Sequence, residues 1–116
     1  MIYEQRLLIV ETVKVNNGII MWRLGSGDNA ELLNLRVTKP RQGTGRLLLC
    51  EMLRRLLQEP PYATIFGFTR VSNTVAQEFY KAMGFELSHV KGVYADGEAI
   101  VFSQTFKELL RIHHVR

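Results

Sequence analysis

Residues 31–46 read ELLNLRVTKPRQGTGR and run from an expected strand, through a basic loop, into an expected helix. Gly43 and Gly45 lack Cβ atoms at alternate positions, so backbone N–H groups there can approach a ligand closely. A helix N-terminus adds unpaired N–H donors and a partial positive charge, which favour a phosphate or diphosphate. Three positive side chains lie nearby: Lys39, Arg41 and Arg46. We expect a diphosphate-binding turn, although a tight strand-to-helix turn that needs glycine for its own geometry would give the same pattern.

The rest of the chain predicts a layered domain with a mixed sheet. Residues 16–18, Asn-Asn-Gly, favour a hairpin turn because Asn and Gly tolerate positive φ. Strand, helix and strand follow one another between residues 30 and 69, and such a crossover joins parallel strands inside an otherwise antiparallel sheet. We therefore predict an α/β (α+β) fold with strands at 6–15, 19–24, 30–38, 63–69, 85–94 and 98–106 and helices at 45–57, 74–83 and 107–116.

Length and composition indicate one globular domain over residues 1–116. Hydrophobic residues make up 47% of the chain and charged residues 22%, which is ordinary for a globular protein. The net charge of +4 suits an anionic ligand, and the sequence offers no aromatic-basic platform or recognition helix for nucleic acid. No apolar run approaches the ~20 residues of a membrane span, and no signal peptide is evident. We expect a cytoplasmic protein that binds neither nucleic acid nor membranes.

Cysteine and histidine predict neither a disulfide nor a metal site. Cys50 is the single cysteine, which excludes an internal disulfide and favours a reducing compartment. It lies among leucines of the first expected helix, where we expect it to be buried. His89, His113 and His114 do not have the spacing of metal ligands, so no metal is expected.

A second motif lies downstream of the glycine turn. Residues 73–85 read NTVAQEFYKAMGF, in which Thr74 and Gln77 fit a capping box and Gly84 fits the position after a helix. With residues 31–37 and 43–45, this stretch resembles the GNAT N-acetyltransferase superfamily, whose second motif is often written Asn-x-x-Ala-x-x-Phe-Tyr-x-x-x-Gly-Phe. The resemblance implies a GNAT-like acyl-CoA N-acyltransferase fold. It also implies direct transfer of an acetyl group from acetyl-CoA to a primary amine, on a small molecule or a peptide.

The resemblance implies roles for particular residues as well. Tyr80 matches the tyrosine that commonly acts as general acid toward the leaving thiolate, and Glu31 matches the catalytic base of histone-acetylating members. Each also has another interpretation: Tyr80 as a core aromatic beside Phe79, Glu31 as a solvent-facing strand residue, and Asn73 as a helix N-cap. Cofactor contacts are expected from Leu35, Arg36, Val37, Arg41, Gln42, Gly43, Thr44, Gly45, Arg46 and Asn73.

Two departures from the family pattern keep other functions open. Pro40 stands where the family usually has Arg or Gln, and the chain starts almost directly at the family's second strand. We therefore expect a short form without the usual N-terminal strand and two helices, whose sheet could be partly uncovered and pair as a homodimer. The alternatives are a non-catalytic acyl-CoA-binding module and an interaction protein that keeps only the fold.

Overall fold

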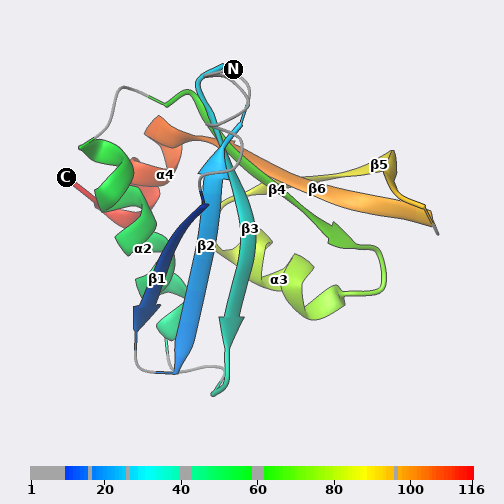
Figure 1. Cartoon of the computed structure of the whole chain (residues 1–116), viewed down its shortest axis with the longest axis horizontal. Coiled ribbons are helices and arrows are strands. Elements are labelled where there is room, and N and C mark those ends of the chain that lie inside the picture. Colours follow the sequence, from blue (N-terminus) through cyan, green and yellow to red (C-terminus); the bar gives the residue numbers. More distant parts are fainter. Residues whose placement is uncertain (1–9, 16, 26, 40–42, 59–61, 96) are drawn as a thin grey trace.

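The computed structural model describes residues 10–15, 17–25, 27–39, 43–58, 62–95 and 97–116. In this part of the chain six strands form one sheet, and helices pack against it (Figure 1). The elements, labelled as in Figure 1, are β1 (Val10–Val15), β2 (Gly18–Leu24), β3 (Asn29–Val37), α2 (Thr44–Leu57), β4 (Thr64–Arg70), α3 (Thr74–Ala82), β5 (Glu86–Tyr94), β6 (Gly97–Thr105) and α4 (Phe106–His113).

The strand order confirms the predicted fold class. The sheet runs β1-β2-β3-β4-β6-β5, and β3 and β4 are parallel while the other neighbours are antiparallel. The last helix is shorter than predicted and ends at His113, because His114 adopts a left-handed φ of 54°. Residues 6–9 of the first predicted strand lie outside the described residues.

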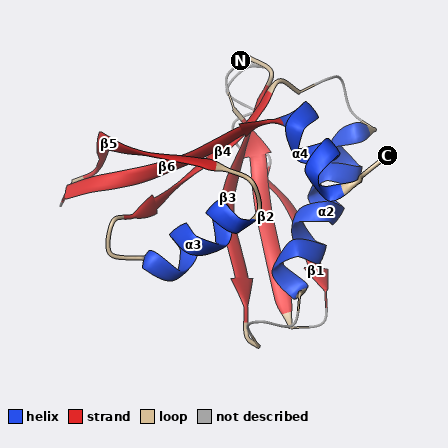
Figure 2. Cartoon of the chain, turned by 180° about the vertical axis from the view of Figure 1, so that it is seen from behind, coloured by secondary structure: helices blue, strands red, loops and turns tan. Residues whose placement is uncertain are grey.

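All three helices pack against one face of the sheet (Figure 2). A Cβ added at Gly45 in α2 would lie 2.7 Å from the Phe79 ring of α3, so these two helices are in close contact there. The core forms between this layer and the strands, and α2 contributes Leu48, Leu49, Met52, Leu53 and Leu56 to it. Cys50 is buried there as expected.

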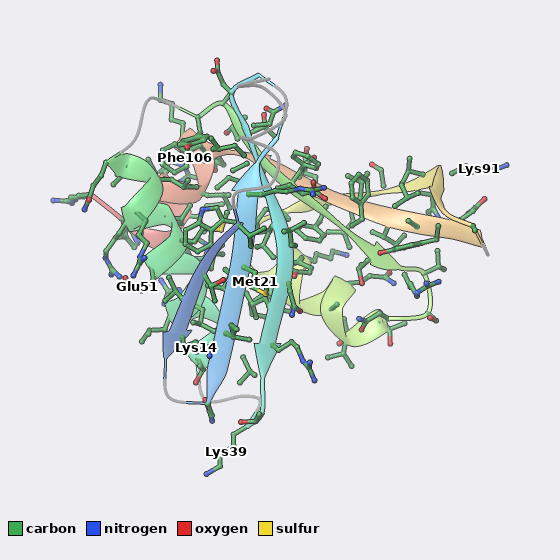
Figure 3. All side chains as sticks on the ribbon, in the orientation of Figure 1. Lys14, Met21, Lys39, Glu51, Lys91 and Phe106 are labelled. Atoms are coloured by element: carbon green, nitrogen blue, oxygen red, sulfur yellow. The ribbon has the colours of Figure 1, made fainter. Side chains whose placement is uncertain are left out.

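The opposite face of the sheet carries no helix among the described residues. Ile20 and Trp22 are buried toward the helices, so strand alternation places Met21, labelled in Figure 3, on this other face. Phe66 and Phe68 of β4 share it, with ring centroids 5.8 Å apart. Within the described ranges no helix is long and apolar enough to cross a membrane.

The junction between β3 and β4 is short, and this shapes the molecule. Their parallel pairing covers only Asn29–Glu31 against Thr64–Phe66, after which the two strands diverge (Figure 1). β3 also contains a bulge, because Met21 pairs with Asn34 while Trp22 pairs with Leu32, which leaves Leu33 without a partner on β2. A bulge bends its strand and changes which residues face each side. The result is an opening in the middle of the sheet.

Candidate functional site

A pocket of about 440 Å³ occupies the opening between the diverging strands. β3 supplies one wall, β4 the other, and α3 with its preceding turn closes the side that faces the helices. The lining residues are Leu33, Asn34, Leu35, Phe68, Thr69, Arg70, Ser72, Asn73, Ala76, Tyr80 and Tyr94. The sequence prediction included Leu35, Asn73 and Tyr80 of this set, and it missed the other lining residues.

The bulge at Leu33 sets the β3 wall of the pocket. Simple alternation would have placed Glu31, Leu33, Leu35 and Val37 on one face of the strand. Instead Ala30 and Leu32 are buried toward the helices before the bulge, and Leu35 and Val37 pack against the same core after it. Leu33 lines the pocket and is 37% exposed. The register shift therefore changes which residues of β3 face each side at this point.

Tyr80 reaches the pocket from α3, and its ring is part of the core. The ring stacks on Phe102 of β6 with centroids 3.7 Å apart and planes 10° from parallel, and it meets Phe85 edge to face. Tyr80 is therefore a core aromatic that is 7% exposed and also lines the pocket, while its role as general acid stays a prediction. Burial raises the pKa of Tyr80 to about 12, so the phenol keeps its proton through the neutral range.

Asn73 caps α3, so the predicted capping box of Thr74 and Gln77 is wrong. Its Oδ1 accepts a hydrogen bond of 3.1 Å from the Ala76 N–H, so Asn73 and not Thr74 is the N-cap. Gln77 does not reach back to the cap; its Nε2 donates to the carbonyl oxygens of Arg70 and Val71. Asn73 also lines the pocket. Gly84 follows the helix with φ of 103°, as predicted.

Arg70 and Tyr94 form a pair at the rim of the pocket. The Arg70 guanidinium lies 4.3 Å from the Tyr94 ring centroid, which is a cation–π contact. The two residues end β4 and β5, which are separated in the sheet by β6. No local motif marks them in the sequence, because only the sheet order brings them together.

Glu31 lies away from the pocket lining. Its carboxylate accepts hydrogen bonds from Nε and Nη2 of Arg23, at 3.1 and 3.0 Å, across the β2–β3 pair. The Glu31 side chain is 16% exposed, and Arg23 covers it from the neighbouring strand. The structure therefore does not bring Glu31 and Tyr80 together in one pocket.

The glycine turn lies at the end of the sheet where β3 ends and α2 begins. Gly43 has φ of 77° and is the N-cap of α2, and a Cβ added there would meet no atom of the described residues within 4 Å. Gly43 has no side chain with which to cap the helix, and the first turn of α2 holds no acidic residue to offset the partial positive charge of the helix N-terminus. Figure 3 labels Lys39 beyond the end of β3, at this same end.

The other predicted cofactor contacts divide into three groups. Thr44, Gly45 and Arg46 form the first turn of α2. Leu35 borders both regions, because it lines the pocket and its Cδ2 would lie 3.6 Å from a Cβ at Gly45. Val37 packs against the core and Arg36 is exposed. Arg41 and Gln42 lie outside the described residues.

Solved structures with the same fold share one biochemical class. The ribosomal-protein-S18-alanine N-acetyltransferase from Escherichia coli is 28% identical, over 78% of this chain and 61% of its own, with a TM-score of 0.61. Naa50 from Arabidopsis thaliana, in complex with the bisubstrate analogue CoA-Ac-MVNAL, is 25% identical, over 75% of this chain and 64% of its own, with a TM-score of 0.60. A protein from Desulfovibrio desulfuricans described as a GNAT-family acetyltransferase is 21% identical, over 78% of this chain and 61% of its own, with a TM-score of 0.66. The chain has the GNAT fold.

These three matches are matches of structure. No protein-family model matches the sequence, and no curated protein matches it. The chain spans less than two thirds of the length of each of these three proteins. Among the described residues, no group of three or more His, Cys, Asp or Glu side chains is placed to hold a metal ion.

Proposed function

We propose that this chain binds acetyl-CoA as co-substrate and transfers its acetyl group directly to a primary amine. The observation that carries the proposal is that Leu35 lines the pocket and also lies beside Gly45 in the first turn of α2, in a chain with the GNAT fold. A ligand with an anionic end and a long uncharged arm fits this arrangement. Acetyl-CoA has both, and the solved neighbours include a complex with a CoA analogue.

The diphosphate would bind at the N-terminus of α2. Backbone N–H groups of Gly43, Thr44 and Gly45 are the donors, since the first four N–H groups of a helix have no partner within it. Gly43 leaves space for an anion because no atom of the described residues lies within 4 Å of where its Cβ would be. Arg46 adds a guanidinium in the same turn.

The uncharged arm would lie in the opening between β3 and β4. Beyond Glu31 and Phe66 these strands no longer pair with each other, so backbone N–H and C=O groups face the opening. The pantetheine arm of CoA has two amides that can bond to such groups as another strand would. An N–H near Leu35–Val37 would then donate to the oxyanion that forms at the thioester carbonyl.

Tyr80 would donate a hydrogen bond to the leaving sulfur. Its pKa of about 12 makes proton loss to a thiolate with a pKa of ~8.5 unfavourable. A phenol that stays protonated can still stabilise negative charge as it develops on sulfur. Tyr80 therefore serves as a fixed donor, held by its stack on Phe102.

The acceptor we favour is an α-amine, such as the N-terminus of a peptide. Glu31 is engaged by Arg23 and is not part of the pocket lining, so the proposal assigns it no role as base. An α-amine with a pKa of ~7.7–8.0 is about one tenth neutral at pH 7, whereas a lysine amine with a pKa of ~10.4 is neutral in about 1 molecule in 2,500. An α-amine therefore needs the least help to become a nucleophile.

Steady-state release of CoA tests the proposal. The protein is mixed with acetyl-CoA and a panel of peptides with free N-termini, and each peptide is repeated with a blocked N-terminus and a free lysine. We expect thiol release and an acetylated α-amine by mass spectrometry. Binding of acetyl-CoA without turnover on any free amine would refute the transferase assignment.

A non-catalytic acyl-CoA-binding module is the second candidate. The observation that favours it is the ion pair between Arg23 and Glu31, because Glu31 is the carboxylate that the family resemblance suggested as a base. Calorimetry separates the two candidates: this alternative expects tight binding of acetyl-CoA with the thioester still intact after prolonged incubation with the amine panel.

A further inference from the structure

His113 on α4 contacts both the end of α3 and the first turn of α2. Its Nε2 lies 2.8 Å from the carbonyl oxygen of Met83, the residue that ends α3. Its Nδ1 lies 3.3 Å from Nε of Arg46. The histidine is 7% exposed, and both contacts are partly buried. None of the sequence motifs or the roles proposed above uses this side chain.

The two partners determine how the ring is protonated. A carbonyl oxygen only accepts hydrogen bonds, so Nε2 of His113 carries a hydrogen and donates it to Met83. The neutral ring then has its lone pair on Nδ1, which accepts from the Arg46 N–H. A second proton on Nδ1 would remove this acceptor and place an imidazolium N–H against a guanidinium N–H.

The surroundings favour the neutral ring. Burial lowers the pKa of His113, the charges of Arg46 and His114 lower it further, and the hydrogen bond to the Met83 carbonyl opposes them. Among the described residues, Arg46 is the charged group that faces the ring from α2 and His114 the titratable group beside it on the chain, while Met83 faces it with a neutral carbonyl.

The guanidinium of Arg46 is hydrogen bonded through Nε, and its Nη groups are available to a ligand. Its Nε hydrogen bonds to His113, and within the described part of the chain its two Nη groups have no hydrogen-bond partner. A guanidinium fork suits the oxygens of a diphosphate. Holding the fork by Nε also reduces the side-chain entropy that a long arginine would lose on binding.

We propose that His113 is a positioning residue for the co-substrate: its neutral ring holds Arg46 in place for the diphosphate, and uptake of a second proton releases this hold. This inference rests on the proposed function, because it assigns the Nη groups of Arg46 to the diphosphate of CoA. It makes CoA affinity depend on pH through one hydrogen bond between α4 and α2.

The test measures binding of dephospho-CoA by calorimetry between pH 5 and 8. Dephospho-CoA keeps the diphosphate but lacks the 3′-phosphate, whose own second pKa of ~6 would otherwise titrate in this window. We expect the Kd of the unaltered protein to rise about tenfold as the pH falls, which is the size of effect of one charge-assisted hydrogen bond. Arg46→Ala should weaken binding about tenfold and remove the pH step. Arg54→Ala is the matched control, since it removes a positive charge from the last turn of the same helix.

Two substitutions at His113 separate its two contacts. His113→Asn can keep an acceptor near Nδ1 for Arg46, and His113→Gln can keep a donor near Nε2 for Met83. We expect the Asn variant to retain the affinity measured at pH 8 at every pH, and the Gln variant to bind about tenfold more weakly throughout. In an Arg46→Ala background, His113→Gln should have no further effect, because the shared contact is already lost.

The outcomes distinguish this inference from the function on which it rests. If the unaltered protein binds neither dephospho-CoA nor CoA at any pH, the proposed function fails and this inference fails with it. If dephospho-CoA binds but its affinity does not change with pH, or the pH step persists in Arg46→Ala, only the positioning role fails. If His113→Gln weakens binding equally in the unaltered protein and in the Arg46→Ala variant, His113 does not act through Arg46 and only supports the fold.

Discussion

At the scale of single residues, Tyr80 combines a place in the core with a hydroxyl at the pocket. Tyr80→Phe keeps the ring that stacks on Phe102 and removes only the donor, so the fold should be retained. We expect kcat to fall about 100-fold, the usual size of effect for a group that assists proton or charge transfer, with little change in the Kd of acetyl-CoA.

Initial rates and calorimetry on the same preparation check this expectation. With a pKa of about 12, Tyr80 stays protonated, so its ionisation should cause no fall in the rate of the unaltered protein up to about pH 10. A raised KM with an unchanged kcat would mean that the hydroxyl only helps to bind the substrate.

Asn73 is the second informative residue, because its capping role can be measured apart from any ligand. Asn73→Ala removes the acceptor of the Ala76 N–H and should lower the free energy of unfolding by about 1 kcal/mol. Asn73→Asp restores an acceptor at the positive end of α3 and should restore stability. Urea unfolding of the three proteins measures both changes, and equal stability of all three would contradict the cap.

At the scale of elements, the contact between α2 and α3 depends on a missing side chain. Ala in place of Gly usually stabilises a helix interior by about 0.5–1 kcal/mol. At Gly45 the added Cβ would lie 2.7 and 2.9 Å from atoms of the Phe79 ring. We therefore expect Gly45→Ala to destabilise the protein by about 1–3 kcal/mol, the usual cost of overpacking.

Gly43→Asn is the matched control for this substitution. No atom of the described residues lies within 4 Å of a Cβ at Gly43, and Asn tolerates its left-handed φ of 77° better than most other residues do. Thermal unfolding should rank the unaltered protein and Gly43→Asn close together, with Gly45→Ala well below. A Gly45→Ala protein as stable as the unaltered one would show that the helices can move apart without cost.

Elements were predictable from the sequence where the signal is local. The spacing of the leucines in α2, the glycine after α3 and the strand-helix-strand crossover from β3 to β4 all lie within short windows, and the fold class follows from their order. The bulge at Leu33 was not predictable, because a shift of one residue changes neither composition nor apolar content. The Arg70–Tyr94 contact depends on β6 lying between β4 and β5, which no single segment encodes.

At the scale of the whole molecule, pH should change stability through His113. Its pKa is lowered in the folded protein, so below the unfolded value of ~6.5 the unfolded chain takes up the proton more readily than the folded one. The contribution is therefore complete above about pH 6.5 and is lost as the pH falls toward the lowered pKa. His113→Asn should remove this part of the pH dependence, and thermal unfolding at pH 7.5 and 5.0 compares the two proteins.

The same comparison separates His113 from the other histidines. His89 and His114 are present in both proteins, so the difference between the two pH dependences reports on position 113 alone. Identical losses of stability in the two proteins between these pH values would show that the buried ring is not the responsible group.

The short seam between β3 and β4 also has a mechanical consequence. It divides the sheet into two halves, β1-β2-β3 and β4-β6-β5, that are joined by backbone pairing over three residues of each strand. Such a junction can flex, and a ligand bound between the halves would restrict their motion relative to each other. Hydrogen exchange at the ends of β3 and β4 that do not pair with each other should then slow together when the ligand is bound. Local opening of either half would require breaking its contacts with the ligand.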